Sequence, residues 1–351
     1  MKAKRIFLSA AGILVLFCVC FSFAQVMPVS SEKNKTVQRV EVPSGSTARQ
    51  ISLILKEKKL IRSSLFFYLC ARYSFARFVF TGKTEPFSLK SGVYQISDSM
   101  GYAEILKILS SGRQEYIRVS FPEGLTISKI ARRLADSGVC SEEEFKSAAK
   151  DASLLAEYKI PGASFEGFLF PDTYFFTPKM SGEDVVRQMA GNFFEKLKSV
   201  NGASSLDMDE IYSDVVLASV VEREYRIEKE APLIASVFRN RLKHNIGLYS
   251  CATIEYILTE IQGKPHPDVI TYDDLKINSP YNTYKWAGLT PGPISNPGMV
   301  ALKAAAEPAK TDYRFFVLKG DGSGTHNFTR TQSEHERAII SYRTKKAAGG
   351  N

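Results

Sequence analysis

The chain has 351 residues, of which 44% are hydrophobic and 24% are charged. These values are ordinary for a folded protein of about two domains, and they exclude a largely disordered chain. The formal net charge is +9, but the basic residues are spread along the sequence and form no short, dense block. This distribution argues against nucleic acid as a partner and favours an anionic lipid or polymer.

The first predicted element is an uncharged segment from Ile6 to Ala24 that follows three basic residues. A helix of this length spans a bilayer, and positive charge in front of it predicts that the remaining chain lies outside the cytoplasm. We therefore predict a cytoplasmic tip and a transmembrane anchor over residues 1–27. The sequence Ser-Phe-Ala at 22–24 also fits a cleavage site, so a removed signal peptide is the alternative.

The cysteines and histidines form no metal-binding pattern. Cys70, Cys140 and Cys251 lie outside the apolar segment, and none of them belongs to a CxxC pair. The four histidines have no HExxH-like spacing. We therefore predict no metal, no cofactor and no disulfide framework, although one bridge stays open.

Residues after the apolar segment show the pattern of a small α+β module. The segment from Val40 to Ile51 reads as a strand, a turn and the start of a helix, and Thr47 and Gln50 have the spacing of a capping box. A second helix follows, which gives a βαα unit, and a strand resumes at 92–96. We predict that this module extends over residues 37–114.

A second copy of the same pattern begins at Val119. The segment from Val119 to Ile130 matches that from Val40 to Ile51, with PxGxT in both. We interpret residues 115–160 as a second strand-turn-helix module that arose by duplication. The alternative is that strand-turn-helix units simply look alike.

The composition changes from Pro161, where we predict the start of a mixed α/β domain over residues 161–345. The segment from Phe165 to Phe176 is dense in aromatic residues around Glu166 and Asp172. Such a segment forms either a core strand or a wall on which sugars stack.

An apolar helix with carboxylates at its end is the central feature of this domain. The helix at 211–221 is almost wholly apolar, so it is predicted to be buried on most sides. Glu222 follows the small residues Ala218 and Ser219 one turn earlier, whereas valines precede Glu224 at that spacing. The space beside Glu222 favours it as the working carboxylate. A solvated or ion-paired helix end is the alternative.

The remaining elements are predicted from periodicity and from Pro and Gly. They are helices over 183–197, 233–242 and 254–261, rigid turns over 281–298, a helix from Met299, a strand over 313–318, a hairpin at 320–324 and a C-terminal helix.

Six ordered motifs carry a resemblance to a known family. They are Phe-Glu-Gly-Phe-Leu-Phe-Pro-Asp-Thr-Tyr from Phe165, Ala-Ser-Val-Val-Glu-Arg-Glu from Ala218, Asn-Arg-Leu from Asn240, Tyr-Asn-Thr-Tyr from Tyr281, Pro-Gly-Pro-Ile-Ser-Asn-Pro-Gly from Pro291 and Pro-Ala-Lys-Thr-Asp-Tyr from Pro308. Together they resemble the endolytic murein transglycosylases, the membrane-anchored YceG-like proteins of bacteria. The likeness extends from the predicted anchor to the last helix.

The resemblance implies an α+β fold with an N-terminal transmembrane helix, a LysM-like βαα module and a mixed α/β catalytic domain. It implies a lytic transglycosylase that cuts the MurNAc-GlcNAc bond of nascent peptidoglycan, leaves 1,6-anhydro-MurNAc ends and limits glycan strand length. Its catalytic acid falls on Glu222. The implied location is the cell inner membrane, with a single-pass anchor, the enzyme on the periplasmic side and peptidoglycan synthases as partners.

Further polar residues are expected to line the glycan groove. They are Glu166, Asn240, Ser250, Thr253, Tyr281, Asn282 and Tyr284. Each of them apart from Glu166 is equally well explained as a support for a loop. The chain departs from the family at 249–253, where Tyr-Ser-Cys-Ala-Thr replaces the usual Gln-Ser-Asp-Pro-Thr. A different substrate specificity or rate is expected from this change.

One acid suffices for lytic transglycosylation, because the same carboxyl gives a proton to the glycosidic oxygen and takes one from the C6 hydroxyl. This dual role needs a raised pKa, which burial at an apolar helix end supplies. A peptidoglycan hydrolase would need a second carboxylate, for which Glu166, Asp172 and Glu224 are candidates. A non-catalytic scaffold that binds the cell wall is the alternative from another class.

Overall fold

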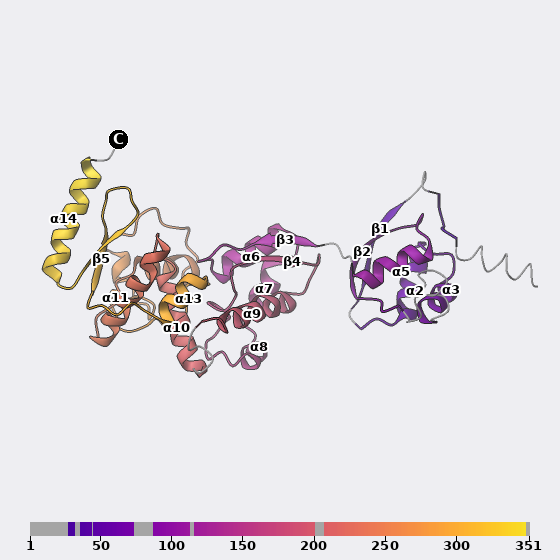
Figure 1. Ribbon diagram of the computed structural model, residues 1–351, viewed down its shortest axis with the longest axis horizontal. Coiled ribbons are helices and arrows are strands. Elements are labelled where there is room, and N and C mark those ends of the chain that lie inside the picture. The colour runs from indigo at the N-terminus through magenta and orange to yellow at the C-terminus, as the bar shows by residue number, and fades with distance from the viewer. Residues whose placement is uncertain are drawn as a thin grey trace, which may run out of the picture. The chain divides into compact units, whose positions relative to one another are not determined.

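The computed structural model describes residues 27–31, 36–43, 45–73, 87–112, 116–200 and 207–348. The chain divides into two compact units, one ending at Tyr116 and one beginning at Ile117 (Figure 1). The anchor predicted over 1–27 lies outside the described residues except at its last position. Across the described ranges, no helix is both long enough and apolar enough to cross a membrane.

The first unit is a small α+β structure with a core of its own. Its elements are β1 (Val37–Val42), α2 (Ala48–Glu57), α3 (Ser64–Arg72), β2 (Gly92–Ser97) and α5 (Tyr102–Ser111). Strands β1 and β2 pair antiparallel, and buried residues of the strands and helices form one apolar cluster. The capping box predicted from Thr47 and Gln50 is confirmed.

The second unit is larger and also mixes helices with short antiparallel strands, which confirms the α+β class. Its elements are β3 (Ile117–Ser120), α6 (Ile127–Asp136), α7 (Glu142–Ala148), α8 (Ala152–Glu157), β4 (Thr173–Phe176), α9 (Gly182–Leu197), α10 (Met208–Val221), η3 (Glu228–Glu230), α11 (Ala231–Lys243), α12 (Cys251–Tyr256), η4 (Ile257–Ile261), η5 (Asp274–Lys276), α13 (Met299–Ala306), β5 (Phe315–Leu318), β6 (His326–Thr329) and α14 (Gln332–Ala348).

The two PxGxT segments adopt the same local structure. Gly45 has φ +76° and Gly124 has φ +75°, a left-handed conformation that favours glycine. Thr47 then caps α2 and Thr126 caps α6, each through its side-chain oxygen. The sequence repeat therefore corresponds to a repeated strand-turn-helix structure.

Residues on both sides of the boundary predicted at 160 share one sheet and one core. Strand β3 pairs antiparallel with β4, so that Ile117 lies opposite Phe176. A single apolar cluster includes Val119, Phe145 and Phe168 together with the buried face of α10. Only Thr173–Phe176 of the aromatic segment is a strand, since the residues before it turn at Gly167.

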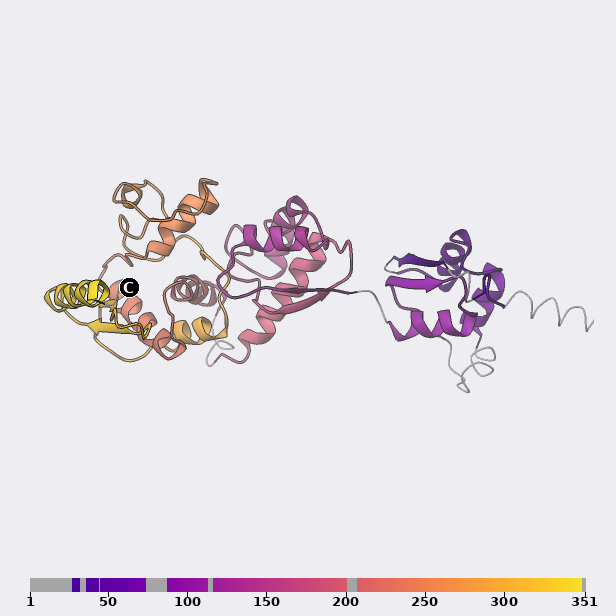
Figure 2. The same cartoon turned by 90° about the horizontal axis from the view of Figure 1, so that it is seen from above.

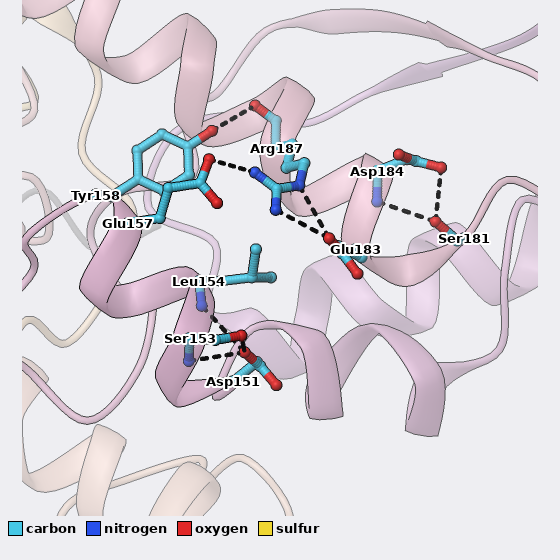
Figure 3. Close-up of polar contacts among 9 residues, drawn as sticks. All are labelled: Asp151, Ser153, Leu154, Glu157, Tyr158, Ser181, Glu183, Asp184 and Arg187. Atoms are coloured by element: carbon cyan, nitrogen blue, oxygen red, sulfur yellow. Dashed lines mark hydrogen bonds and ion pairs between the residues drawn. The ribbon is translucent and has the colours of Figure 1, made fainter.

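Helices α8 and α9 are fastened to each other by Arg187 (Figure 3). Its guanidinium donates hydrogen bonds to the carboxylates of Glu157 and Glu183, and its carbonyl oxygen accepts one from the Tyr158 hydroxyl at 3.5 Å. Asp151 caps α8 and Ser181 caps α9. These contacts hold α9 where its aromatic residues pack against Phe168.

Helix α10 packs against α11 and α13, and this group positions the site described next. Beyond α13, strands β5 and β6 pair antiparallel, with Phe315 opposite Thr329. The C-terminal helix α14, yellow in Figure 2, packs on these strands. The helix predicted to continue to Ile261 does so, but its last turn is a π-helix.

Candidate active site

Glu222 lies at the point where α10 leaves the core. Asp207 and Glu210 form a capping box that starts the helix, and residues 215–221 are all buried. Glu222 is the C-cap residue of the helix, and its side chain is partly exposed. The helix is thus buried up to the residue before Glu222, and the Glu222 carboxyl lies at the border between the apolar core and solvent.

Two donors hold the Glu222 carboxyl. The backbone N–H of Gly298 donates to Oε2 at 2.9 Å, and the hydroxyl of Tyr225 donates to Oε1 at 3.2 Å. Burial raises the pKa of Glu222 to about 7, a rise that these two hydrogen bonds reduce. A carboxyl with this pKa can give and take a proton near neutral pH.

The segment that delivers Gly298 is fixed to α10 through Ser219. The Ser219 hydroxyl accepts a hydrogen bond from the backbone N–H of Ile294 at 3.0 Å. The Ser295 hydroxyl donates to the Ser219 carbonyl at 3.0 Å. Ser219 lies one turn before Glu222 in α10. Its hydroxyl and its carbonyl therefore fix the segment of Gly298 to the same helix that carries Glu222.

Asn296 joins this segment to two others. Its side-chain oxygen accepts from the backbone N–H groups of Gly167 and Leu169, each at 2.9 Å. Its amide nitrogen donates to the carbonyl of Leu125 at 2.9 Å and to Glu166 Oε1 at 2.8 Å. The buried amide therefore connects the turn before α6, the aromatic segment and the loop that leads to Gly298.

Glu166 is almost fully buried, with 5% of its surface exposed. Both carboxyl oxygens accept the backbone N–H of Ile127, the first residue of α6. Burial raises the pKa of Glu166 to about 8. These contacts are those of a buried structural support, and the sugar-binding role of Glu166 stays a prediction. Asp172, by contrast, is exposed.

Ser250 and Thr253 lie together at the start of α12. The Ser250 hydroxyl donates to Glu224 Oε1 at 2.5 Å, and the Thr253 hydroxyl donates to the Ser250 carbonyl at 2.7 Å. Thr283 contacts both, since its hydroxyl accepts from the Ser250 N–H at 3.1 Å and lies 2.9 Å from the Thr253 hydroxyl. Burial raises the pKa of Glu224. Glu224 thus links the end of α10 to α12.

Tyr281, Asn282 and Tyr284 belong to the loop beside this cluster. Asn282 is fully buried and donates to the carbonyls of Leu275 and Ile277 at 2.9 and 2.8 Å, so it supports the loop from inside. The Tyr284 hydroxyl lies 3.0 Å from Sγ of Cys251. Cys251, where the chain departs from the family pattern, therefore contacts Tyr284, which was predicted to bind glycan.

Tyr281 and Asn240 have different surroundings. The Tyr281 ring packs against that of Tyr256, with centroids 5.2 Å apart. The Asn240 amide donates to the carbonyls of Thr311 and Tyr313 at 2.8 and 2.9 Å. Asn240 also lines an open cavity of about 490 Å³ beside α11. Its hydrogen bonds support the segment after α13.

Several residues of the site were not singled out by the sequence. Tyr225 is three residues beyond Glu222, and this helical spacing could have indicated it. Asn296 and Gly298 belong to a motif that carried the resemblance, but the sequence does not show which groups they contact. Among the described residues, no group of three or more His, Cys, Asp and Glu side chains could hold a metal ion.

Comparisons with known proteins identify the family of the chain. The sequence profile of the YceG-like family matches residues 40–341. The endolytic murein transglycosylase of Bacillus subtilis (strain 168) is 32% identical over 335 residues, which cover 91% of this chain and 88% of that protein. The endolytic murein transglycosylase of Streptococcus pneumoniae serotype 2 is 27% identical, with 97% of this chain and 64% of that protein covered.

A solved structure is also similar. The crystal structure of a yceG-like protein from Listeria monocytogenes matches with a TM-score of 0.55 and 29% sequence identity, covering 87% of this chain and 99% of that one. The resemblance carried by the six motifs is thereby confirmed, and the chain belongs to the YceG-like family.

Proposed function

We propose that the protein is an endolytic murein transglycosylase that cleaves the MurNAc-GlcNAc bond within nascent peptidoglycan strands. The observation that carries this proposal is the Glu222 carboxyl, held by Gly298 and Tyr225, with a pKa raised to about 7. The names of the relatives from Bacillus and Streptococcus support the same activity.

The reaction uses Glu222 twice. Its proton goes to the glycosidic oxygen while the bond from that oxygen to C1 breaks, and the bonding electron pair leaves with the oxygen. The C6 hydroxyl of the same sugar then bonds to the oxocarbenium-like C1, and its proton returns to Glu222. The product has a 1,6-anhydro end, water is not consumed, and the enzyme is restored.

Gly298 and Tyr225 act on the state between the two steps, in which Glu222 is negatively charged. A hydrogen bond to a carboxylate stabilises the charged form more than the neutral form. The two donors therefore stabilise Glu222 after it has lost its proton, and they fix the direction in which its oxygens point. Burial opposes this effect, which keeps the carboxyl close to equal protonation at neutral pH.

The remaining parts of the chain suit an enzyme at the cell wall. We propose a LysM-like role in peptidoglycan binding for the first unit, supported by its β-α-α order and separate core. The apolar segment before it is proposed as a single-pass anchor in the inner membrane, with the enzyme on the periplasmic side. In that place it would meet new glycan beside the peptidoglycan synthases and limit strand length.

Replacement of Glu222 by glutamine tests the proposal against a non-catalytic scaffold. Glu222→Gln keeps the size and the accepting oxygen of the side chain but cannot give a proton. We expect cleavage of isolated peptidoglycan to fall by at least about a hundredfold, while binding to cell wall persists. Glu143→Gln, an exposed change on α7, is the matched control and should retain full cleavage. Unchanged cleavage by Glu222→Gln would contradict the catalytic role of Glu222.

A further inference from the structure

A second carboxylate, Glu123, lies beside the proposed catalytic acid. It belongs to the turn between β3 and α6 and is exposed. Within the described ranges its side chain has no hydrogen-bond or ion-pair partner. Because Glu123 is exposed, water solvates its carboxylate, and the group can stay charged without a partner.

The backbone places Glu123 and Glu222 around one residue, Gly298. A Cβ atom added to Gly298 would lie 2.4 Å from Cγ of Glu123 and 3.3 Å from its Oε1. The N–H of the same glycine donates to Glu222 Oε2 at 2.9 Å. The two carboxylates therefore lie within about 9 Å of each other. Only glycine at 298 leaves room for both.

The turn that carries Glu123 is also fixed against Glu222. The N–H of Gly124 donates to the carbonyl of Asn296 at 2.9 Å, and a Cβ on Gly124 would lie 3.7 Å from Cγ of Glu222. The position of Glu123 is thus determined by the same Asn296 segment that positions Gly298.

The repeat shows that this turn does not need a carboxylate. In the first copy of the PxGxT pattern, Ser44 occupies the place that Glu123 has in the second. The glycines that follow have φ +76° and φ +75°, and the same threonine cap begins the helix in both copies. The charge at 123 is therefore a feature of the copy that faces Glu222.

The other charged and titratable groups that act on Glu222 are Arg223 and Tyr225. The Arg223 guanidinium donates to both oxygens of Glu255, at 2.7 and 2.8 Å, so its positive charge is largely offset. Tyr225 is a hydrogen-bond donor. Within the part of the chain that the structure describes, no cation pairs with Glu123. Its negative charge therefore adds to the effect of burial in raising the pKa of Glu222.

We propose that Glu123 is a positioning residue of the reaction, whose negative charge keeps the proton on Glu222 at neutral pH. This inference rests on the proposed function, because it assigns a purpose to the protonated state of Glu222. A negative charge near a carboxyl group disfavours the ionisation of that group.

The test is the pH profile of kcat/KM for peptidoglycan cleavage by the full chain and its Glu123→Gln variant. Removal of the charge should move the alkaline limb to lower pH by about half a unit or more, and the rate at low pH should stay within about twofold. Glu143→Gln removes the same charge from α7 and should leave the limb unmoved. Added salt should move the wild-type limb towards that of Glu123→Gln, because it screens exposed charge.

The outcomes separate this inference from the proposed function. If the alkaline limb of the kcat/KM profile of Glu123→Gln lies at the same pH as that of the wild type, while Glu222→Gln is inactive, only the role of Glu123 is overturned. Loss of activity in Glu123→Gln at every pH, with an unchanged Tm, would mean that Glu123 reacts directly and would also overturn it. Cleavage that persists in Glu222→Gln refutes the proposed function itself.

Discussion

At the scale of single residues, the site depends on how one carboxyl is held between two protonation states. Burial at the end of α10 favours the neutral form of Glu222, whereas Tyr225 and Gly298 favour the charged form. The balance brings its pKa to about 7. The sequence indicated Glu222 and the need for burial, but not the two donors. Tyr225 is only three residues away and was not singled out, whereas the position of Gly298 depends on contacts between distant segments.

This balance predicts the pH dependence of the wild-type enzyme. In the proposed reaction Glu222 must be protonated at the start, so kcat/KM should fall as the pH rises through about 7. Tyr225→Phe removes a donor that stabilises the carboxylate, and the fall should therefore move to higher pH. The direction is opposite to that expected for Glu123→Gln. If the fall in kcat/KM moved in the same direction in Tyr225→Phe and Glu123→Gln, the opposite effects assigned to these two residues would be contradicted.

Glu166 provides a prediction about stability. Its folded-state pKa is raised to about 8 from a usual 4.5, so its contribution to stability is present at low pH and is lost as the pH rises through 8. Glu166→Gln does not ionise, and its single side-chain oxygen can replace Oε1, which accepts from Ile127 and Asn296. Between pH 6 and pH 9, we expect the wild type to lose about 2 kcal/mol of unfolding free energy relative to Glu166→Gln. Urea unfolding at both pH values measures this difference, and parallel losses would contradict it.

At the scale of elements, periodic segments were predictable and irregular ones were not. Helices α9 and α11 follow their apolar spacing and α10 follows its continuous apolar run, and the predicted limits of all three differ little from those observed. The aromatic segment before Thr173 lacks strand structure because Gly167 turns the chain at φ +89°. Its path depends on Asn296, which lies far away in the sequence. Local pattern carries no information about such a partner.

Gly167 provides the test at this scale. A Cβ at Gly167 would lie 2.6 Å from Pro293 and 2.8 Å from Val215, so Gly167→Ala must displace the segment that leads to Gly298. We expect a loss of more than about 2 kcal/mol of unfolding free energy, together with a marked loss of cleavage.

Gly191→Ala is the matched control for that change. Gly191 lies in α9, and nothing is within 4 Å of an added Cβ. The substitution should stabilise the protein by about 0.5 to 1 kcal/mol and leave cleavage unchanged. If Gly167→Ala and Gly191→Ala had equal effects on stability and cleavage, the close packing around Gly167 would not be needed to position the site.

At the scale of the whole molecule, the two units have separate cores, and all residues of the proposed site belong to the second unit. The sequence predicted a division near residue 114, and the units divide at 116. It also predicted a further boundary at 160, yet β3 and β4 pair across it. Pairing between strands so far apart is not encoded in either strand alone.

The separate cores predict that residues 117–351 fold without the first unit. This fragment should unfold cooperatively, with a Tm close to that of one transition of the full chain, and it should cleave soluble glycan strands. If the first unit binds peptidoglycan as proposed, the affinity of the fragment for insoluble cell wall should be lower. Calorimetry and sedimentation with cell wall measure the two properties, and equal affinity would refute the binding role of the first unit.

The central claim is that Glu222 catalyses an intramolecular transfer and not a hydrolysis. Mass spectrometry of the glycan ends released from peptidoglycan by the full chain tests it most directly. We predict 1,6-anhydro ends, each lighter by one water than a reducing end, and their absence with Glu222→Gln. Reducing ends released by the wild type would contradict the account, because they require a second carboxylate that activates water or forms a covalent intermediate.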